Sequence, residues 1–408
     1  MMLSVNVIPR FALPYGYGDL LAALTALLRN QIPSPDPFDK LLGNGEKFWT
    51  SSGRQALWLS IKALDLVPGS GVAVPLFNDL SVSTAVVEAG CRPIFIDINE
   101  HTLTMDPDSL AENRDQISAV VAVHLFGNVA DIKRIRQAAG PVPLVEDTVH
   151  APLSRLDGKG VGEFGLVCFH SFASTKYWPA GGGGLLVVRE PAVARRVAEE
   201  LRLLERQPII DEWSNLLLQI AKAIVFRKPV YGTFGLAIRS WAEKKAFLEP
   251  ALNRRHIQRH HAAVAIRQAL RFSERVSRQR ENSLYLLSLL EEAEGVVLPH
   301  ERSGAVYNYH LFPVLMSDDE ERTAVAAAML KRGVDTSRIY SDAINHSRKL
   351  GYSAGCPVSE SVAARLLTLP NYASLSRSDI ERVAQAFLQA LNQYRLSSRS
   401  KSPRPLID

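Results

Sequence analysis

The chain has 408 residues, which exceeds the usual size of one domain and favours two structural units, one of them large. Hydrophobic residues make up 47% and charged residues 22%, so the composition excludes a disordered or fibrous protein. The formal charge is a modest +5. The cysteines, Cys91, Cys168 and Cys356, match no metal-binding spacing, which favours reduced thiols in the cytoplasm and no metal site.

Strand-like and helical patterns alternate in the first half of the chain. Residues 1–14 lack the apolar core of a secretion signal, which also favours a cytoplasmic protein. The short apolar runs are 72–75, 93–98, 119–126, 143–147, 166–172 and 184–188. This alternation predicts a mainly parallel sheet covered by helices, and the near-continuous apolar runs predict strands that are buried on both faces.

Helical composition dominates residues 190–295, and shorter strand signals return from about residue 296, with helices near 319–332 and 376–391. The apolar run 216–226 is too short to span a bilayer, and it favours a subunit contact over peripheral contact with a membrane. The predicted units are a large α/β domain (1–245), a helical connector (246–295), a small C-terminal α/β domain (296–395) and a flexible basic tail (396–408).

Arginines are concentrated in residues 254–280. Two interpretations remain open: a solvated helix face, or a surface that binds the phosphate groups of a ligand. Nucleic acid is not expected as a partner, because no aromatic side chains interleave with these arginines to stack on bases.

One candidate for chemistry is Lys176, which stands between the strand-like run 166–172 and four glycines at 181–184. Glycines permit close backbone approach and positive φ angles, so a lysine beside them is accessible. The alternative is an ordinary surface lysine that precedes a flexible hairpin.

A second candidate is Asp147, which ends an apolar strand with Glu146, while His150 follows three residues later. Ligands bind at the carboxyl ends of strands in open α/β sheets. An aspartate there can keep a pyridine nitrogen protonated, although capping of a following helix is the alternative.

The third candidate segment contains Ser51, Ser52, Gly53 and Arg54 just before an amphipathic helix. Small residues at a helix N-terminus leave backbone N–H groups free to bind a phosphate. A routine N-cap by Ser51 or Ser52 is the alternative.

In order and spacing, these three segments resemble the DegT/DnrJ/EryC1/StrS family of sugar aminotransferases, which depend on pyridoxal 5'-phosphate (PLP). The resemblance is strongest over residues 48–188 and resumes at 309–314, 332–340, 356–357 and 367–376. It implies aminotransferase fold type I, with a large domain built on a mainly parallel sheet and a smaller C-terminal α/β domain.

The resemblance also implies residue roles. Lys176 falls on the lysine that forms the Schiff base with PLP, and Asp147 falls on the partner of the pyridine nitrogen. The other implied cofactor contacts are Ser171, Gly53 and Arg54 at the phosphate, His150 near the ring hydroxyl, and Asn253 or Arg254 reaching the neighbouring subunit. Where the family stacks an aromatic side chain on the ring, this chain has Asp79, with Phe77 two residues earlier.

The implied reaction is amino transfer, from glutamate to a keto-sugar linked to a nucleotide, for polysaccharide or glycoconjugate biosynthesis in a homodimer. A sugar dehydratase of the same family is disfavoured, because those members carry histidine where this chain has Lys176. The departures leave one alternative open, a catalytically altered or inactive family member that acts as a PLP-binding sensor or assembly protein.

Overall fold

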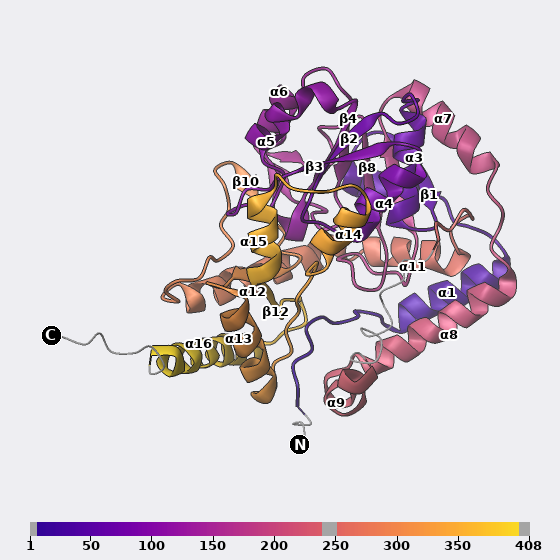
Figure 1. Ribbon diagram of the computed structural model, residues 1–408. Helices are drawn as coiled ribbons and strands as arrows, with labels where there is room; N and C mark the ends of the chain where they lie inside the picture. Colours follow the sequence, from indigo (N-terminus) through magenta and orange to yellow (C-terminus); the bar gives the residue numbers. More distant parts are fainter. Residues whose placement is uncertain (1–5, 239–250, 400–408) are drawn as a thin grey trace.

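The computed structural model describes residues 6–238 and 251–399, and Figure 1 shows how its elements are arranged. The boundary predicted between residues 245 and 246 lies outside the described residues.

A seven-stranded sheet forms the centre of the larger part, in the order β1-β9-β8-β5-β4-β2-β3. Its strands are β1 (Glu46–Thr50), β2 (Gly71–Pro75), β3 (Arg92–Ile96), β4 (Ala119–Val123), β5 (Leu144–Asp147), β8 (Val167–Ser171) and β9 (Gly184–Val188). Strands β3, β2, β4, β5 and β8 pair in parallel, whereas β9 and β1 add antiparallel pairs at one side. The mainly parallel sheet predicted from the sequence is therefore confirmed.

Helices cover both faces of this sheet, because alternate residues of each strand point to opposite faces. Val72 and Val74 of β2 pack in the apolar cluster that includes α3, α4 and α7. Ala73, between them, packs in a different cluster with α5 and α6. The covering elements are α3 (Gly53–Ala63), α4 (Leu80–Glu88), α5 (Pro107–Glu112), η2 (Arg114–Gln116), η3 (Leu125–Gly127), α6 (Ile132–Ala139) and α7 (Pro191–Arg202).

A helical region flanks the sheet, and α1 and α8 run side by side in it (Figure 1). Its elements are α1 (Tyr17–Arg29), η1 (Asp36–Phe38), α2 (Asp39–Leu42), α8 (Ile209–Val225), α9 (Lys228–Val230), η4 (Tyr231–Gly235), α11 (Arg259–Ala269) and α12 (Phe272–Leu290). The apolar run 216–226 lies mostly in α8. Within residues 6–238 and 251–399, no helix combines the length and the apolar character that a membrane crossing requires.

The C-terminal part contains a two-stranded antiparallel sheet of β11 (Phe312–Leu315) and β12 (Leu366–Leu369). Its helices are α13 (Asp319–Lys331), α14 (Ala343–Lys349), α15 (Pro357–Arg365) and α16 (Arg377–Arg399). A small separate sheet joins β10 (Ala305–Val306), β6 (Arg155–Leu156) and β7 (Lys159–Gly160).

The described start of the predicted flexible tail is helical, because α16 continues to its end at Arg399. The ion pair between Arg395 and Glu321 of α13, at 2.7 Å, fixes the helix just before residues 396–399. Residues 396–399 therefore belong to a helix, and residues 400–408 of the predicted tail lie outside the described residues.

Candidate active site

A cavity lies at the carboxyl ends of the parallel strands, where β2, β4, β5 and β8 give way to loops. The predicted site residues that line it are Gly53, Arg54, Asp147, His150, Ser171 and Lys176. The sheet itself brings two of them together, since β5 and β8 are parallel neighbours that end at Asp147 and Ser171. Residues far apart in the sequence thus meet at one edge of the sheet, as expected for an α/β fold.

Asp147 supplies a buried carboxylate, with only 7% of the residue exposed. Its Oδ1 atom accepts a hydrogen bond from the backbone N–H of Val149 at 3.0 Å. Burial raises the pKa of Asp147 to about 6, against the opposing effect of this hydrogen bond and of the Lys176 charge. A protonated ring nitrogen would relieve the cost of the buried negative charge, so the residue fits a pyridine cofactor.

Lys176 lies in the loop between β8 and β9, and its side chain is 16% exposed. The Nζ atom is 3.1 Å from Oδ2 of Asp79 and 3.3 Å from Nε2 of His150. Burial would lower the pKa of Lys176, but Asp79, Tyr340 and Asp147 together outweigh it and raise the pKa above its ordinary value. The lysine is therefore held as an ammonium beside a carboxylate.

Uncharged rings enclose the other side of the lysine. Burial lowers the pKa of His150 well below its usual range, and it lowers the pKa of His310 to about 3. Tyr340 places its hydroxyl 3.4 Å from Nε2 of His150, and the two rings are parallel to within 13°. At neutral pH, His150 and His310 are thus neutral.

The N-terminus of α3 forms the end of the cavity where a phosphate would bind. Ser52 is its N-cap, and its hydroxyl accepts a hydrogen bond from the N–H of Gln55 at 3.1 Å. A Cβ atom on Gly53 would lie 2.8 Å from Cβ of Ser171, so only glycine permits this close approach. Glycine, a serine hydroxyl and a helix N-terminus suit a phosphate group, so the residues present fit PLP.

Three predicted cofactor contacts have other partners in the structure. Arg54 lines the cavity, but it also forms an ion pair with Glu88, with Nε 2.9 Å from Oε2. Asn253 and Arg254 do not line the cavity. The carbonyl of Asn253 accepts a hydrogen bond from Oγ of Ser51 at 2.9 Å, and the Arg254 guanidinium lies 5.3 Å from the centre of the Trp58 ring.

Asp79 and Tyr340 also line the cavity, and neither had a role assigned from the sequence. Asp79 was noted only as the replacement of an aromatic side chain. Phe77 does not take over that position, since it is fully buried against Phe126 and Tyr340 and does not line the cavity. Tyr340 has a positive φ of 60°, a strained conformation that occurs often at functional sites.

Fold and site together define a PLP-dependent enzyme. A model of the DegT/DnrJ/EryC1/StrS aminotransferase family matches residues 36–388, and the chain belongs to that family. It is a PLP-dependent aminotransferase.

Known relatives extend over most of the chain. The dTDP-4-dehydro-2,3,6-trideoxy-D-glucose 4-aminotransferase of Saccharopolyspora spinosa is 28% identical over 363 residues, which cover 86% of this chain and 85% of the relative. The UDP-N-acetyl-3-dehydro-alpha-D-glucosamine 3-aminotransferase of Acidithiobacillus ferrooxidans is 26% identical, with 84% and 83% covered. The crystal structure of the aminotransferase TlmJ from Streptoalloteichus hindustanus superimposes with a TM-score of 0.76 at 26% identity, covering 97% of this chain and 100% of TlmJ.

Proposed function

We propose that this chain transfers an amino group from glutamate to a keto-sugar linked to a nucleotide, for the synthesis of a polysaccharide or another glycoconjugate. The observation that carries the proposal is the presence of Lys176 and Asp147 in one cavity at the carboxyl ends of the parallel strands. The activities of two relatives, on a dTDP-linked and a UDP-linked sugar, support the substrate class.

When bound, PLP supplies an electron sink for the transfer. Asp147 would hold the pyridine nitrogen through a charge-assisted hydrogen bond, which requires the carboxylate form. Ser171 and the N–H groups at the start of α3 would hold the phosphate, and His150 would lie near the ring hydroxyl.

Lys176 has two tasks in this proposal. It would hold the cofactor through Nζ, and when it is free its Nζ atom would take up and return the proton that moves during the transfer. Its neighbours Asp79 and His150 keep Nζ within the cavity. The same residues serve both halves of the reaction, the release of the amino group by the donor and its uptake by the sugar.

We further propose a cytoplasmic homodimer. Support comes from exposed apolar side chains on the adjacent helices α1 and α8, since a cluster of this kind marks an interaction surface. They are Tyr17, Leu21, Leu28, Ile209, Ile210, Leu217, Leu218 and Ile224. Contact of Asn253 or Arg254 with the cofactor phosphate of the neighbouring subunit remains part of this proposal.

Absorbance spectroscopy tests the proposed reaction. Purified protein with added PLP should show the long-wavelength band of a lysine-linked cofactor, and added glutamate should remove it. Lys176→Ala should lack the band, whereas Lys133→Ala, which removes an exposed lysine paired with Asp157, should retain it.

A band that forms equally well in Lys176→Ala would contradict the role of this lysine. A lysine-dependent band that resists every amino donor would contradict amino transfer, and would favour the PLP-binding sensor or assembly protein.

A further inference from the structure

Two carboxylates stand among the described residues that line the cofactor cavity, those of Asp79 and Asp147. Burial raises the pKa of Asp147 to about 6. Burial would also raise the pKa of Asp79, but the charge of Lys176 and the hydrogen bonds from Ser81 outweigh it and lower the pKa to about 2. The proposed function gives Asp147 the ring nitrogen, and it leaves the permanent negative charge of Asp79 without a ligand group.

The start of helix α4 fixes the position of Asp79. The residue is the N-cap of this helix, and its Oδ1 atom accepts hydrogen bonds from the backbone N–H of Ser81 at 3.1 Å and from the Ser81 hydroxyl at 2.7 Å. The Oδ2 atom lies 3.1 Å from Nζ of Lys176. One oxygen thus anchors the carboxylate to the helix, and the other is presented to an amine.

The other ionisable groups near Nζ do not supply a negative charge in contact with it. Burial lowers the pKa of His150 and of His310, so both rings are neutral at neutral pH. Burial raises the pKa of Tyr340, so its hydroxyl keeps its proton. Among the described residues, Asp79 is therefore the anionic group that contacts Nζ.

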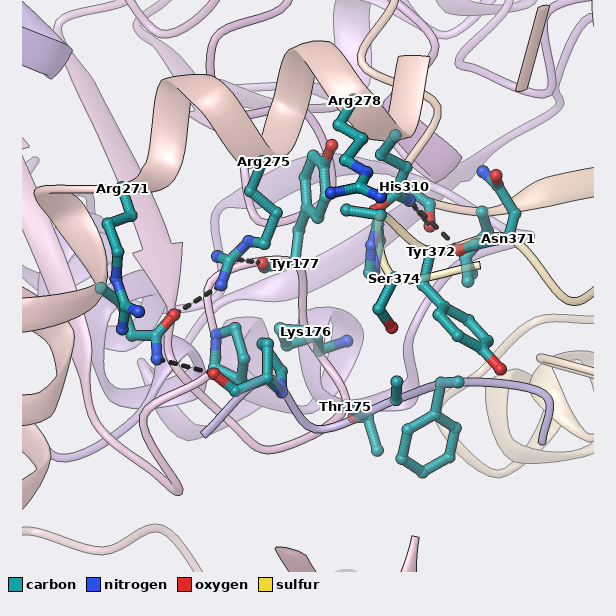
Figure 2. A pocket seen from close by; sticks show the side chains of 18 of the residues that line it. Thr175, Lys176, Tyr177, Arg271, Arg275, Arg278, His310, Asn371, Tyr372 and Ser374 are labelled. Carbon is teal, nitrogen blue, oxygen red and sulfur yellow. Dashed lines mark hydrogen bonds between the residues drawn. The ribbon is translucent and has the colours of Figure 1, made fainter. Parts of the chain in front are cut away.

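Asp79 contacts the lysine from the side of the cofactor. Lys176 also lines a second cavity, whose walls Figure 2 shows, but Asp79 does not. When PLP is attached, Nζ is bonded to the reactive carbon of the cofactor. In pyridoxamine 5'-phosphate (PMP), the amine form of the cofactor, the amine nitrogen is bonded to that same carbon. A carboxylate that reaches Nζ from the cofactor side is therefore placed to reach the amine of PMP.

A carboxylate and an aromatic side chain differ in what they offer such an amine. An alkylammonium group gains a charge-assisted hydrogen bond from a carboxylate, which is about twice as strong as a hydrogen bond between neutral groups. An aromatic ring, which the family resemblance leads us to expect at position 79, stacks on the cofactor but carries no counter-charge. The aspartate therefore favours a cationic group at the reactive carbon.

We propose that Asp79 binds the cationic amine of PMP and so makes the cavity selective for the amine form of the cofactor. This inference rests on the proposed function, in which the amino donor leaves the cofactor as PMP. No covalent bond joins PMP to the protein, so the cofactor is held between the two halves of the reaction by non-covalent contacts alone. The contact with Asp79 adds to those of Asp147 and Ser171 and retains PMP until the sugar arrives.

Isothermal titration calorimetry of the full chain, freed of cofactor, tests the inference with PMP and with pyridoxine 5'-phosphate. The second compound has a hydroxyl in place of the amine, and neither compound forms a covalent bond with Lys176. We expect the wild type to bind PMP about tenfold or more tightly than pyridoxine 5'-phosphate. Asp79→Asn should reduce this ratio about tenfold, with little change in the affinity for pyridoxine 5'-phosphate. Asparagine caps a helix as well as aspartate does, so the variant removes only the charge.

Asp106→Asn is the matched control, because Asp106 is the N-cap of α5, accepts from the backbone N–H of Asp108 at 2.9 Å and does not line the cofactor cavity. It should leave the ratio of the two affinities unchanged.

Equal affinities of the wild type for the two compounds would overturn the inference. An unchanged ratio in Asp79→Asn would overturn it as well, because the aspartate would then serve only as a helix cap. Asp79→Ser, which also retains a capping side chain, replaces Asp79→Asn if that variant does not fold. Binding of PMP requires no amino transfer, whereas loss of the PLP band on addition of glutamate does, so a failure of this inference and a failure of the proposed function are distinguishable.

Discussion

The carboxylate of Asp79 lies 3.1 Å from the Nζ atom of Lys176. The other oxygen of Asp79 caps helix α4, accepting from the backbone N–H of Ser81 at 3.1 Å and from its hydroxyl at 2.7 Å. Burial would raise the pKa of Asp79, but Lys176 and Ser81 hold it at about 2. A fixed negative charge thus stabilises the ammonium form of the lysine.

Asp79→Asn should therefore speed the attachment of PLP. The raised pKa of Lys176 keeps little of the nucleophilic neutral amine at neutral pH, and loss of the negative charge lowers that pKa. Each pKa unit increases the neutral fraction about tenfold, so the pH–rate profile should shift to lower pH. Stopped-flow absorbance of apo protein mixed with PLP measures this shift. Asparagine retains the N-cap, so α4 remains intact.

Asp108→Asn is the matched control, since Asp108 is an exposed carboxylate paired with Arg134. An unchanged profile in Asp79→Asn would show that Asp79 does not set the protonation of the lysine.

The affinity for PLP should depend on the ionisation of Asp147. Its pKa is raised to about 6 in the free protein, and binding of a protonated ring nitrogen favours the carboxylate and lowers that pKa. The contribution of the Asp147 carboxylate to the affinity for PLP is thus fully present above about pH 6, and it is lost as the pH falls below that value. Equilibrium titration with PLP across this range measures the loss.

The cofactor phosphate also titrates near pH 6, and Asp147→Asn separates the two effects. The variant should bind PLP more weakly at neutral pH and show a shallower pH dependence. If PLP affinity changed with pH equally in the wild type and in Asp147→Asn, the whole pH dependence would come from the cofactor phosphate.

Gly53→Ala should destabilise the protein and weaken PLP binding. The new Cβ atom would approach Cβ of Ser171 to 2.8 Å, and such overpacking costs about 1–3 kcal/mol. Urea unfolding of the free protein measures the change in the free energy of unfolding. Combining it with Ser171→Gly removes the conflicting atom, so the double variant should lose less stability than the sum of the single variants. Additive losses would contradict the steric explanation.

Charge introduced on α8 should dissociate the proposed homodimer. Leu217 and Leu218 are 65% and 51% exposed, so Leu217→Arg and Leu218→Arg leave the core of the subunit intact. Sedimentation velocity should show a dimer for the wild type and monomers for the variants. Val67→Arg, at a position that is 75% exposed after α3, is the control. A dimer that survives both α8 variants would place the subunit contact elsewhere.

Local sequence patterns predicted most of the central sheet. Strands β2, β4, β5, β8 and β9 are short apolar runs between turn residues, and parallel strands buried on both faces have that appearance. Strand β1 was not predicted, because Glu46 and Lys47 interrupt its apolar character at an edge where burial is incomplete. The same patterns place Asp147 and Ser171 at strand ends, so their meeting followed from the fold class.

Contacts between distant segments could not be predicted from the sequence. Tyr340 reaches His150 across 190 residues, and no local pattern connects them. Arg54 has a side chain of the kind that binds phosphate. Its ion pair with Glu88, however, depends on the packing of α3 against α4. The division into domains and the cross-subunit role of Asn253 or Arg254 stay predictions.

Lys176 lines the cofactor cavity and also a second cavity, of about 280 Å³, between α12 and the segments around His310 and Tyr372. A reactant that enters through the second cavity therefore meets the lysine before it reaches the cofactor. If the amino donor and the sugar both use this entrance, each excludes the other, and the two would compete although they have little chemistry in common.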